Sequence, residues 1–345
     1  MSFENIQKIP TPAEIIAEMP LSDALKAIKQ QRDEEISRIF KGTSHKFLAI
    51  IGPCSADDEE AVCEYARRLA KLQSVVAENV VLIPRVYTNK PRTTGAGYKG
   101  MAHQPNPHDA PNIAEGIRAI RRLHVRILRE TGLSAADEML YPGNYPYLED
   151  LLSYVAIGAR SVENQEHRLT VSGLDIPVGM KNPTSGDITV MLNSVEAGQQ
   201  PHVFIYNGWE VKTSGNSLVH SILRGAVNHY GQCVPNYHYE DLVRVADTYL
   251  KRKLKYPAVV VDTNHANSNK KYDEQPRIAW EIMRNIKKSP ELKNLIKGLM
   301  IESYLVEGAQ EVREKIFGKS ITDPCLGWDA SVQLVMELAD FLRKN

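Results

Sequence analysis

Apolar runs that end abruptly in charged or polar residues recur along this chain, and they constrain its fold more than any other feature. The clearest run is 258–261 (Ala-Val-Val-Val), which is followed at once by Asp262 and, three residues later, by His265. Such a run is typical of a strand buried on both faces of a parallel sheet. Ligands bind at the carboxyl ends of these strands in α/β folds, so the polar residues there are candidate site residues.

Eight such runs alternate with amphipathic helical segments between residues 46 and 345. They lie at residues 47–51, 80–86, 135–139, 155–160, 176–181, 202–206, 258–261 and 299–302. Strands and helices in this order predict an α/β fold, specifically a TIM-type (β/α)8 barrel. The alternative is a doubly wound open sheet, but neither a G-x-G-x-x-G motif nor a P-loop follows the first run.

Residues 1–45 show no strand pattern. Three prolines precede a charged amphipathic segment that predicts a helix from about Ser22, a plausible N-cap, to Phe40. We therefore expect an N-terminal helical extension (1–45) outside a catalytic barrel domain (46–345). The extension could pack on the bottom of the barrel, on another subunit, or over a regulatory site.

Composition excludes several classes of protein. Lys+Arg and Asp+Glu are both 42, so the charge balance gives no sign of a nucleic-acid or membrane partner. No apolar stretch is long enough to cross a bilayer, and the N-terminus lacks a basic segment followed by an apolar one. The cysteines are widely spaced without a C-x-x-C pair, which argues against a disulfide framework or a closed structural zinc site. We expect a cytoplasmic protein with reduced thiols.

Cations gather at or after the ends of the predicted strands. These residues are Arg85, Lys90, Arg92, Arg160, Lys181 and Arg224. Each alone could be an ordinary surface residue, but together they would repel one another unless an anion neutralises them. Arginine binds phosphate or carboxylate through two hydrogen bonds and lysine acts as a point charge. The cluster therefore predicts a phosphorylated, doubly anionic substrate, with enough cations for two.

Residues of metal-binding type occupy the same region of the predicted barrel. They are Cys54, His265, Glu302 and Asp323. A mixed sulfur, nitrogen and oxygen set suits manganese, iron, cobalt or zinc better than magnesium. Each residue also has a structural interpretation: a buried thiol in a tight turn, a core histidine, or an acid paired with an arginine.

The loop that follows the second run, 87–111, is long for a barrel connection and therefore predicts a functional role. It begins with Lys90-Pro-Arg-Thr-Thr94, in which Arg92 and the Thr93 hydroxyl make a donor set of the size of a phosphate group. Lys90 could donate a proton if neighbouring cations lower its pKa. The structural alternative is a rigid polar loop.

Taken in order, several motifs resemble the type I 3-deoxy-D-arabino-heptulosonate 7-phosphate (DAHP) synthases, in particular the subgroup typified by the feedback-regulated enteric enzymes. The resemblance runs from about Phe47 to the C-terminus. The motifs are Gly52-Pro-Cys-Ser55, Lys90-Pro-Arg-Thr-Thr94, Gly158-Ala-Arg160, Lys181-Asn182, Leu223-Arg-Gly225, His265-Ala-Asn-Ser268, Glu302-Ser303, Glu307-Gly308, Thr322-Asp323 and Gly327-Trp328.

This resemblance implies a transferase that condenses phosphoenolpyruvate with erythrose 4-phosphate, releasing phosphate, at the first step of the shikimate pathway. It implies one divalent metal ion that polarises the aldehyde, with Lys90 protonating the developing alkoxide. It also implies a homo-oligomer, either a dimer or a tetramer. The implied metal ligands are Cys54, His265, Glu302 and Asp323, of which Cys54 and His265 would also be catalytic.

The same resemblance divides the other residues between the two substrates. Phosphoenolpyruvate would be held by Arg85, Arg160, Lys181 and Arg224, with Glu138 beside these cations. Erythrose 4-phosphate would be met by Lys90, Arg92 and Thr93, the last two on its phosphate.

Two rivals remain for the function. The sibling 3-deoxy-manno-octulosonate 8-phosphate synthases share the barrel and the phosphoenolpyruvate site, but their equivalent loop typically reads Lys-Ala-Asn-Arg where this chain has Lys90-Pro-Arg-Thr93. A non-catalytic homologue would have lost a metal ligand or Lys90, and none is missing.

Segment 204–213 looks shorter than the hairpin that helps form the aromatic amino-acid site of the regulated enzymes. We therefore expect weak inhibition, or none, by phenylalanine, tyrosine or tryptophan.

Overall fold

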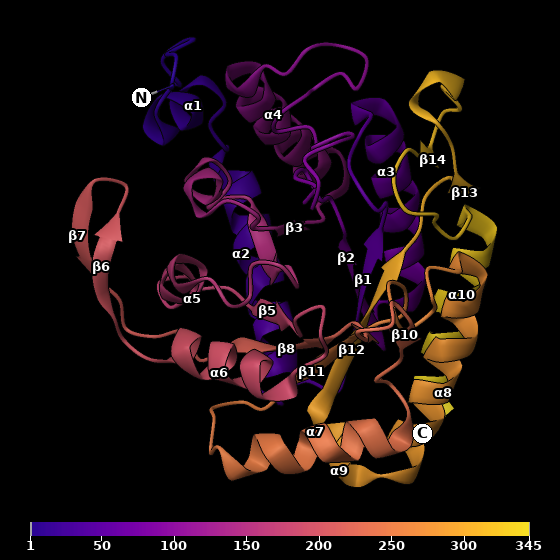
Figure 1. The fold of residues 1–345 in the computed structure, drawn as a ribbon. Coiled ribbons are helices and arrows are strands. Elements are labelled where there is room, and N and C mark those ends of the chain that lie inside the picture. Colours follow the sequence, from indigo (N-terminus) through magenta and orange to yellow (C-terminus); the bar gives the residue numbers. More distant parts are fainter. Residues whose placement is uncertain (1, 345) are drawn as a thin grey trace.

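A closed ring of eight parallel strands forms the centre of the molecule (Figure 1). The computed structural model describes residues 2–344. Around the ring the strands run β2-β1-β12-β11-β8-β5-β4-β3. Arg85 at the end of β2 pairs in parallel with Ala136 of β3, and the Val86 N–H donates to the Ala136 carbonyl at 2.8 Å, which closes the ring. The predicted TIM barrel is therefore confirmed.

The barrel strands are short and almost completely buried, as expected for a sheet that is covered by helices outside and filled by side chains inside. They are β1 (Phe47–Gly52), β2 (Val80–Pro84), β3 (Ala135–Glu138), β4 (Leu152–Ile157), β5 (Val178–Lys181), β8 (Val219–Leu223), β11 (Val259–Asp262) and β12 (Ile296–Glu302). The covering helices are α3 (Glu59–Val76), α4 (Ile113–Thr131), α5 (Gln165–Val171), α6 (Ile188–Gln199), α7 (Tyr239–Lys251), α8 (Gln275–Lys288), α9 (Pro290–Leu295) and α10 (Trp328–Lys344).

Three small two-stranded sheets lie outside the barrel. They are formed by β6 (Val203–Tyr206) with β7 (Trp209–Lys212), β9 (Ala226–Val227) with β10 (Cys233–Val234), and β13 (Val306–Ala309) with β14 (Lys319–Ser320). Within residues 2–344, no helix combines the length and the apolar content needed to cross a bilayer.

The predicted sixth barrel strand, 202–206, was wrong. Its residues form β6 of a hairpin that stands away from the barrel (Figure 1), and their side chains are only half-buried or exposed. The sixth place in the barrel belongs to β8, which pairs with β5 and β11. Because β8 carries His220 and Ser221 in its middle, it lacks the continuous apolar run that marked the other strands.

The N-terminal segment forms two helices, α1 (Pro12–Glu18) and α2 (Asp23–Phe40). Ser22 caps α2, as predicted, by accepting a hydrogen bond from the Leu25 N–H. The last turn of α2 buries Ile39 and Phe40 in the cluster of side chains that fills the barrel interior. This cluster includes the residues that begin several strands, so α2 closes the amino-terminal end of the barrel. Of the three positions considered for the extension, α2 occupies the first, on the bottom of the barrel.

His220 lies under this helix, fully buried between Phe40 and Tyr154. Its Nε2 lies 2.8 Å from the Tyr154 hydroxyl and its Nδ1 lies 2.9 Å from the Leu218 carbonyl oxygen. Burial lowers the pKa of His220 to about 4. The unfolded chain therefore takes up a proton near pH 6.5 that the folded chain excludes until about pH 4.

We therefore expect the neutral His220 to contribute about 3 kcal/mol to the free energy of unfolding above pH 6.5. This contribution should be lost progressively as the pH falls from 6.5 toward 4. The measurement is the free energy of unfolding in denaturant at a series of pH values. His220→Gln, which cannot gain a proton, should show a shallower decline. Equal slopes for the two proteins would contradict the assignment.

Candidate active site and metal centre

Three residues of metal-binding type meet at the carboxyl end of the barrel. Single ligand atoms of Cys54, Glu302 and Asp323 all lie within 4.8 Å of one another. Strand β1 pairs with β12 so that Gly52 lies opposite Glu302, which places Cys54 beside the Glu302 carboxylate. Gly52 is required here because a Cβ atom at this position would lie 2.3 Å from the Arg85 carbonyl oxygen.

His265 stands at the edge of this group. Its Nε2 lies 3.9 Å from Glu302 Oε1, and its Nδ1 lies 2.8 Å from Asp262 Oδ2. The backbone of His265 has a φ of 48°, a left-handed conformation that is uncommon outside glycine and is often found at functional sites. Asp262 thus holds the ring so that Nε2 faces Glu302, the arrangement by which a carboxylate orients a metal-binding histidine.

Asp262 is fully buried, yet it stays ionised. Burial alone would raise the pKa of its carboxyl, but the charges of His265 and Lys181 outweigh burial and hold that pKa well below its usual range. Lys181 Nζ lies 3.3 Å from Asp262 Oδ2. One buried carboxylate therefore positions both a predicted metal ligand and a predicted substrate-binding lysine.

Two lysines contact the predicted metal ligands. Lys90 Nζ lies 2.6 Å from Cys54 Sγ, and Lys270 Nζ lies 2.8 Å from Asp323 Oδ1. Burial, reinforced by Glu302, raises the pKa of the Cys54 thiol to about 11. Burial opposes ionisation of Glu302 and Asp323, but neighbouring cations outweigh it and hold the pKa values of both carboxyl groups below their ordinary range.

The lysine pKa expected from the sequence was wrong in direction. Burial by itself lowers the pKa of Lys90, but the nearby acidic groups Cys54, Glu302 and Asp323 raise it above its ordinary value. The sequence places Lys90 next to other cations of its loop. It does not show that the fold surrounds Lys90 with Cys54, Glu302 and Asp323.

Two of the predicted phosphoenolpyruvate residues, Arg85 and Lys181, lie over the ring of Tyr87. The Arg85 guanidinium lies 3.7 Å from the centre of the Tyr87 ring, and Lys181 Nζ lies 5.7 Å from it. Arg85 donates to Glu302 Oε1 at 2.8 Å and to the Pro53 carbonyl. Both cations are buried and fixed before any ligand arrives.

Three polar atoms of the predicted phosphoenolpyruvate residues are buried without hydrogen-bond partners among residues 2–344. They are Arg85 Nε, Arg224 Nη1 and Glu138 Oε1. Burial lowers the pKa of Arg224, opposed by the charge of Asp262 and assisted by that of Arg160, so these groups share one electrostatic environment. Buried polar atoms without partners are rare in folded proteins, and several together indicate that a ligand completes them.

The loop residues lie farther out. Arg160 and Thr93 are exposed, and Arg160 Nε donates to Thr93 Oγ1 at 3.0 Å. Arg92 Nε donates to the Tyr98 carbonyl at 2.8 Å within its own loop. The structure thus brings Thr93 to the cation cluster through Arg160 and leaves Arg92 bonded inside the loop.

Sequence reasoning missed two residues that contact the site, Lys270 and Tyr87, and assigned no role to Asp262 and Asn264. Asn264 Nδ2 donates to Glu302 Oε2 at 2.5 Å. Asp262 and Asn264 stand at the polar end of the clearest strand, so their position was a usable signal. Nothing in the sequence distinguished Tyr87 or Lys270 from other loop residues.

Comparisons with known proteins agree with this geometry. Residues 24–336 match the family model described as the DAHP synthetase I family. The chain is 36% identical to the phospho-2-dehydro-3-deoxyheptonate aldolase of Haemophilus influenzae, covering 98% of this chain and 92% of that protein. It is also 36% identical to the Phe-sensitive aldolase of Escherichia coli, covering 99% and 97%.

A solved structure gives the same result. The phospho-2-dehydro-3-deoxyheptonate aldolase of Francisella tularensis superposes with a TM-score of 0.91 at 31% identity, covering 99% of this chain and 98% of that one. The aldolase of Thermotoga maritima superposes with a TM-score of 0.58 at 19% identity, a likeness of fold alone.

Proposed function

The chain belongs to the DAHP synthetase I family, and from this premise we propose which of its residues carry the reaction. It condenses phosphoenolpyruvate with erythrose 4-phosphate to give DAHP and phosphate, which begins the shikimate pathway to the aromatic amino acids. The octulosonate synthase alternative is not favoured, because the matched relatives are heptonate aldolases. The assignment rests on the match of nearly the whole chain to the family model and to the heptonate aldolases.

Cys54, His265, Glu302 and Asp323 would hold a divalent metal ion. Three of the four meet within 4.8 Å, and Asp262 already orients the fourth. The thiolate favours manganese, iron, cobalt or zinc over magnesium. When bound, such an ion would supply a Lewis acid that polarises the sugar aldehyde.

Arg85, Lys181, Arg160 and Arg224 would bind the phosphate and carboxylate of phosphoenolpyruvate. The partnerless Arg85 Nε and Arg224 Nη1 support this, because an anion would satisfy both. The Glu138 carboxylate lies against residue 158, which must be glycine because a Cβ there would lie 2.5 Å from Glu138 Oε1. Glu138 would orient the cations rather than touch the anionic substrate.

Arg92 and Thr93 would bind the phosphate of erythrose 4-phosphate. The hydrogen bond from Arg160 to Thr93 supports this assignment, since it links the groups proposed for the two substrates. Holding two anions in reacting positions removes much of the entropic barrier to their condensation. Arg92 would have to give up its bond to Tyr98 or use its free nitrogens.

Lys90 would protonate the oxygen that was the aldehyde as C3 of phosphoenolpyruvate attacks. Its Nζ already touches Cys54, a proposed metal ligand, so the proton is held where the oxygen must lie. A divalent cation among the same acids would oppose their effect on Lys90 and lower its pKa. Water then adds at C2, and phosphate leaves by cleavage of its bond to that carbon.

A phosphate-release assay tests the function. With phosphoenolpyruvate present, erythrose 4-phosphate should give turnover and arabinose 5-phosphate at least about 100-fold less, because the extra carbon of arabinose 5-phosphate prevents its aldehyde and its phosphate from both reaching their positions. Chelation should abolish the activity and a divalent ion should restore it. A preference for the five-carbon sugar would overturn the substrate assignment, while full activity after chelation would overturn the metal.

Inhibition by aromatic amino acids is expected to be weak or absent. The structure contains the hairpin β6–β7, whose four-residue strands are joined by the two residues Asn207 and Gly208. The expectation rests on this hairpin being shorter than that of the regulated enzymes, and it stays a prediction. The measurement is the initial rate at increasing phenylalanine, tyrosine and tryptophan. Clear inhibition by any one of them at physiological concentration would contradict it.

We also propose that the enzyme is a homo-oligomer, as a dimer or tetramer. The hairpin presents Ile205 and Trp209 at 81% and 75% exposure, and the N-terminal Phe3 is 91% exposed. Large apolar side chains gathered on projecting segments indicate a surface that another copy covers. Light scattering that gave the mass of one chain would contradict this proposal.

The cytoplasm is the proposed compartment. All four cysteines are free in the structure, and a thiolate ligand such as Cys54 requires a reducing environment. Cell fractionation would test this.

A further inference from the structure

Asp137 is a buried acid at the carboxyl end of β3, next to Glu138 and outside the residues assigned to the substrates or the metal. Its carboxylate accepts three hydrogen bonds. Oδ1 accepts from the Thr88 N–H at 2.9 Å and from the Glu138 N–H at 2.7 Å, and Oδ2 accepts from the Thr88 hydroxyl at 2.5 Å. Hydrogen bonds to a carboxylate are shorter and stronger than those between neutral groups, so these bonds hold Thr88 firmly against β3.

These bonds replace the last backbone contact between β2 and β3. The Val86 N–H donates to the Ala136 carbonyl at 2.8 Å. In a parallel ladder the next donor, the Thr88 N–H, would meet the Glu138 carbonyl. That carbonyl instead accepts from the N–H two residues later at 2.9 Å, because the chain turns away after β3. The Asp137 side chain therefore satisfies a buried backbone donor that the sheet leaves over.

Thr88 is the root of the loop that carries the proposed proton donor, residues 87–111, which we call the Lys90 loop. The Thr88 carbonyl accepts from the Ala102 N–H at 3.1 Å, and the Lys90 N–H donates to the Lys99 carbonyl at 3.0 Å. Both of these bonds join one leg of the loop to the other. Among residues 2–344, Asp137 is the side chain that bonds the Thr88 backbone to the barrel.

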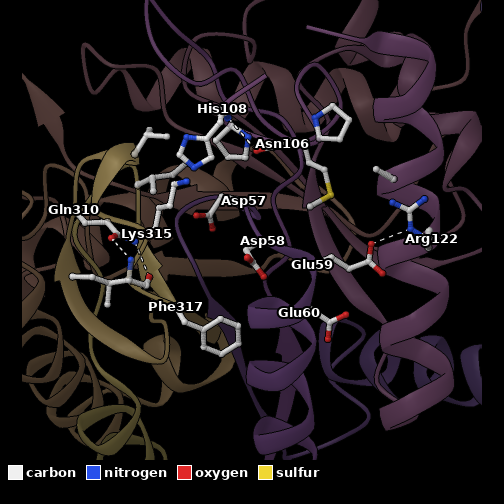
Figure 2. A pocket seen from close by; sticks show the side chains of 18 residues that line it. Asp57, Asp58, Glu59, Glu60, Asn106, His108, Arg122, Gln310, Lys315 and Phe317 are labelled. Carbon is white, nitrogen blue, oxygen red and sulfur yellow. Dashed lines mark hydrogen bonds and ion pairs between the residues drawn. The ribbon is translucent and has the colours of Figure 1, made fainter. Parts of the chain in front are cut away.

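The outer part of the Lys90 loop lies beside a cavity. Figure 2 shows Asn106 and His108 of this part, which line an open cavity of about 450 Å³ together with Phe317. Their polar bonds are local: Asn106 Nδ2 donates to Asp109 Oδ2 at 2.8 Å, and the His108 N–H donates to Asn106 Oδ1 at 3.1 Å. The contact with β3 that holds Lys90 in place therefore lies at the root of the loop.

Lys90 depends on this root for its position. Its Nζ lies 2.6 Å from Cys54 Sγ and 3.3 Å from the Cys54 carbonyl oxygen. A proton donor acts only within hydrogen-bond reach of the reacting oxygen, and a displacement of about 1 Å can cost on the order of 100-fold in rate. Because Thr88 lies two residues before Lys90, a shift of its backbone would carry directly to Lys90.

Pairing with His124 does not account for Asp137. His124 Nε2 lies 3.6 Å from Asp137 Oδ2, beyond hydrogen-bond distance, and both ring nitrogens of His124 are buried without hydrogen-bond partners within residues 2–344. The short bonds of the carboxylate all go to Thr88 and Glu138.

We propose that Asp137 is a positioning residue for Lys90. By holding Thr88 to β3, it keeps the Lys90 ammonium group beside Cys54, where the oxygen that was the aldehyde is protonated. This inference rests on the proposed role of Lys90 as the proton donor and adds to it a residue that touches neither substrate.

The kinetics of Asp137→Ala test the proposal, with Asp137→Asn as the conservative variant. Removing the carboxylate should lower kcat at least about tenfold. The KM for phosphoenolpyruvate should stay within about twofold, because Arg85 and Lys181 keep their own carboxylate partners. Asp137→Asn should keep most of the activity, since its amide oxygen can accept from both N–H groups and its amide nitrogen can donate to the Thr88 hydroxyl. An unchanged kcat in Asp137→Ala would overturn the proposal.

Asn216→Ala is the matched control for a loss of stability alone. Asn216 is also buried and also bonds the backbone of two barrel segments, at the amino-terminal end: it donates to the Ile176 carbonyl and accepts from the Leu218 N–H, both at 2.9 Å. This variant should unfold at a lower temperature and keep its kcat. If Asn216→Ala and Asp137→Ala lost kcat equally, the proposal would be wrong.

A double-mutant cycle with Lys90→Met separates positioning from a general loss of structure. In the Lys90→Met background, Asp137→Ala should lower kcat by less than about twofold, because the group that it positions is gone. The same fold-loss in both backgrounds would overturn this inference and leave the proposed function standing. Full activity of Lys90→Met by itself would instead overturn the proposed role of Lys90, and this inference with it.

Thermal unfolding checks that Asp137→Ala is folded. If it is not, Thr88→Val repeats the cycle, because valine keeps the shape of threonine and removes only the bond to Asp137 Oδ2. We expect this variant to lose at least about threefold in kcat, the effect of one hydrogen bond, and to lose nothing further when Lys90 is methionine. An unchanged kcat in Thr88→Val, or an equal loss in both backgrounds, would then overturn the proposal.

Discussion

Replacing Cys54 by alanine is expected to lower the affinity for the divalent ion at least about 100-fold and kcat at least about 1,000-fold. The thiolate is the softest donor of the proposed set, and its loss leaves oxygen and nitrogen ligands that compete poorly for the same ions. A Lewis acid that contributes several kcal/mol to the transition state accounts for the loss of rate. The measurements are metal content after dialysis and the rate of phosphate release.

Cys63→Ala is the matched control, because Cys63 is a buried thiol on α3 and is not among the proposed ligands. It should keep both its metal and its activity, apart from some loss of stability. If Cys54→Ala retains a full equivalent of metal with unchanged affinity, the ligand assignment is wrong even when activity falls.

Replacing Lys90 by methionine should reduce kcat by about 10²- to 10⁴-fold, the usual contribution of a positioned proton donor. Methionine fills similar space and removes only the charge and the proton. The KM for phosphoenolpyruvate should change little, since the groups proposed to bind it are elsewhere. Metal content should not fall, because removing a cation 2.6 Å from Cys54 cannot weaken the attraction of that site for another cation.

Lys270→Met provides the comparison. Lys270 contacts Asp323 as closely as Lys90 contacts Cys54, but its side chain is 57% exposed while that of Lys90 is 11% exposed. We expect an effect below about tenfold, since an exposed ion pair is worth little. Similar losses in the two variants would mean that Lys90 acts through general electrostatics and not as a proton donor.

The strands that could be predicted were those whose burial on both faces leaves a continuous apolar run. This held for β1 and β11 and failed for β8, whose buried His220 is hydrogen-bonded to Tyr154 of β4 inside the barrel. The exposed hairpin β6 resembled a barrel strand in composition because it is apolar without being buried. A polar residue such as His220 can be buried when a hydrogen-bond partner is present, and that partner, Tyr154, lies 66 residues away in the sequence.

Three of the four predicted metal-binding residues lie together in the structure, whereas the direction of the pKa shift of Lys90 was not predicted. Cys54, Glu302 and Asp323 come together because three strand ends and loops meet at one end of the barrel, a consequence of topology that the order of elements already implied. The pKa of Lys90 depends on which acids surround it in space, and the sequence held no record of that. The sequence indicated that Asp262 lies at the polar end of a strand. It did not indicate that Asp262 contacts both Lys181 and His265, because these contacts depend on the fold.

The helix that precedes the first strand has a practical consequence for anyone who shortens this protein. Ile36, Ile39 and Phe40 serve as the floor of the barrel, so a cut placed just before Phe47 would admit water to Tyr154 and His220. Helix α2 is therefore part of the barrel core. A shortened protein can omit residues before α2 but must retain α2 itself.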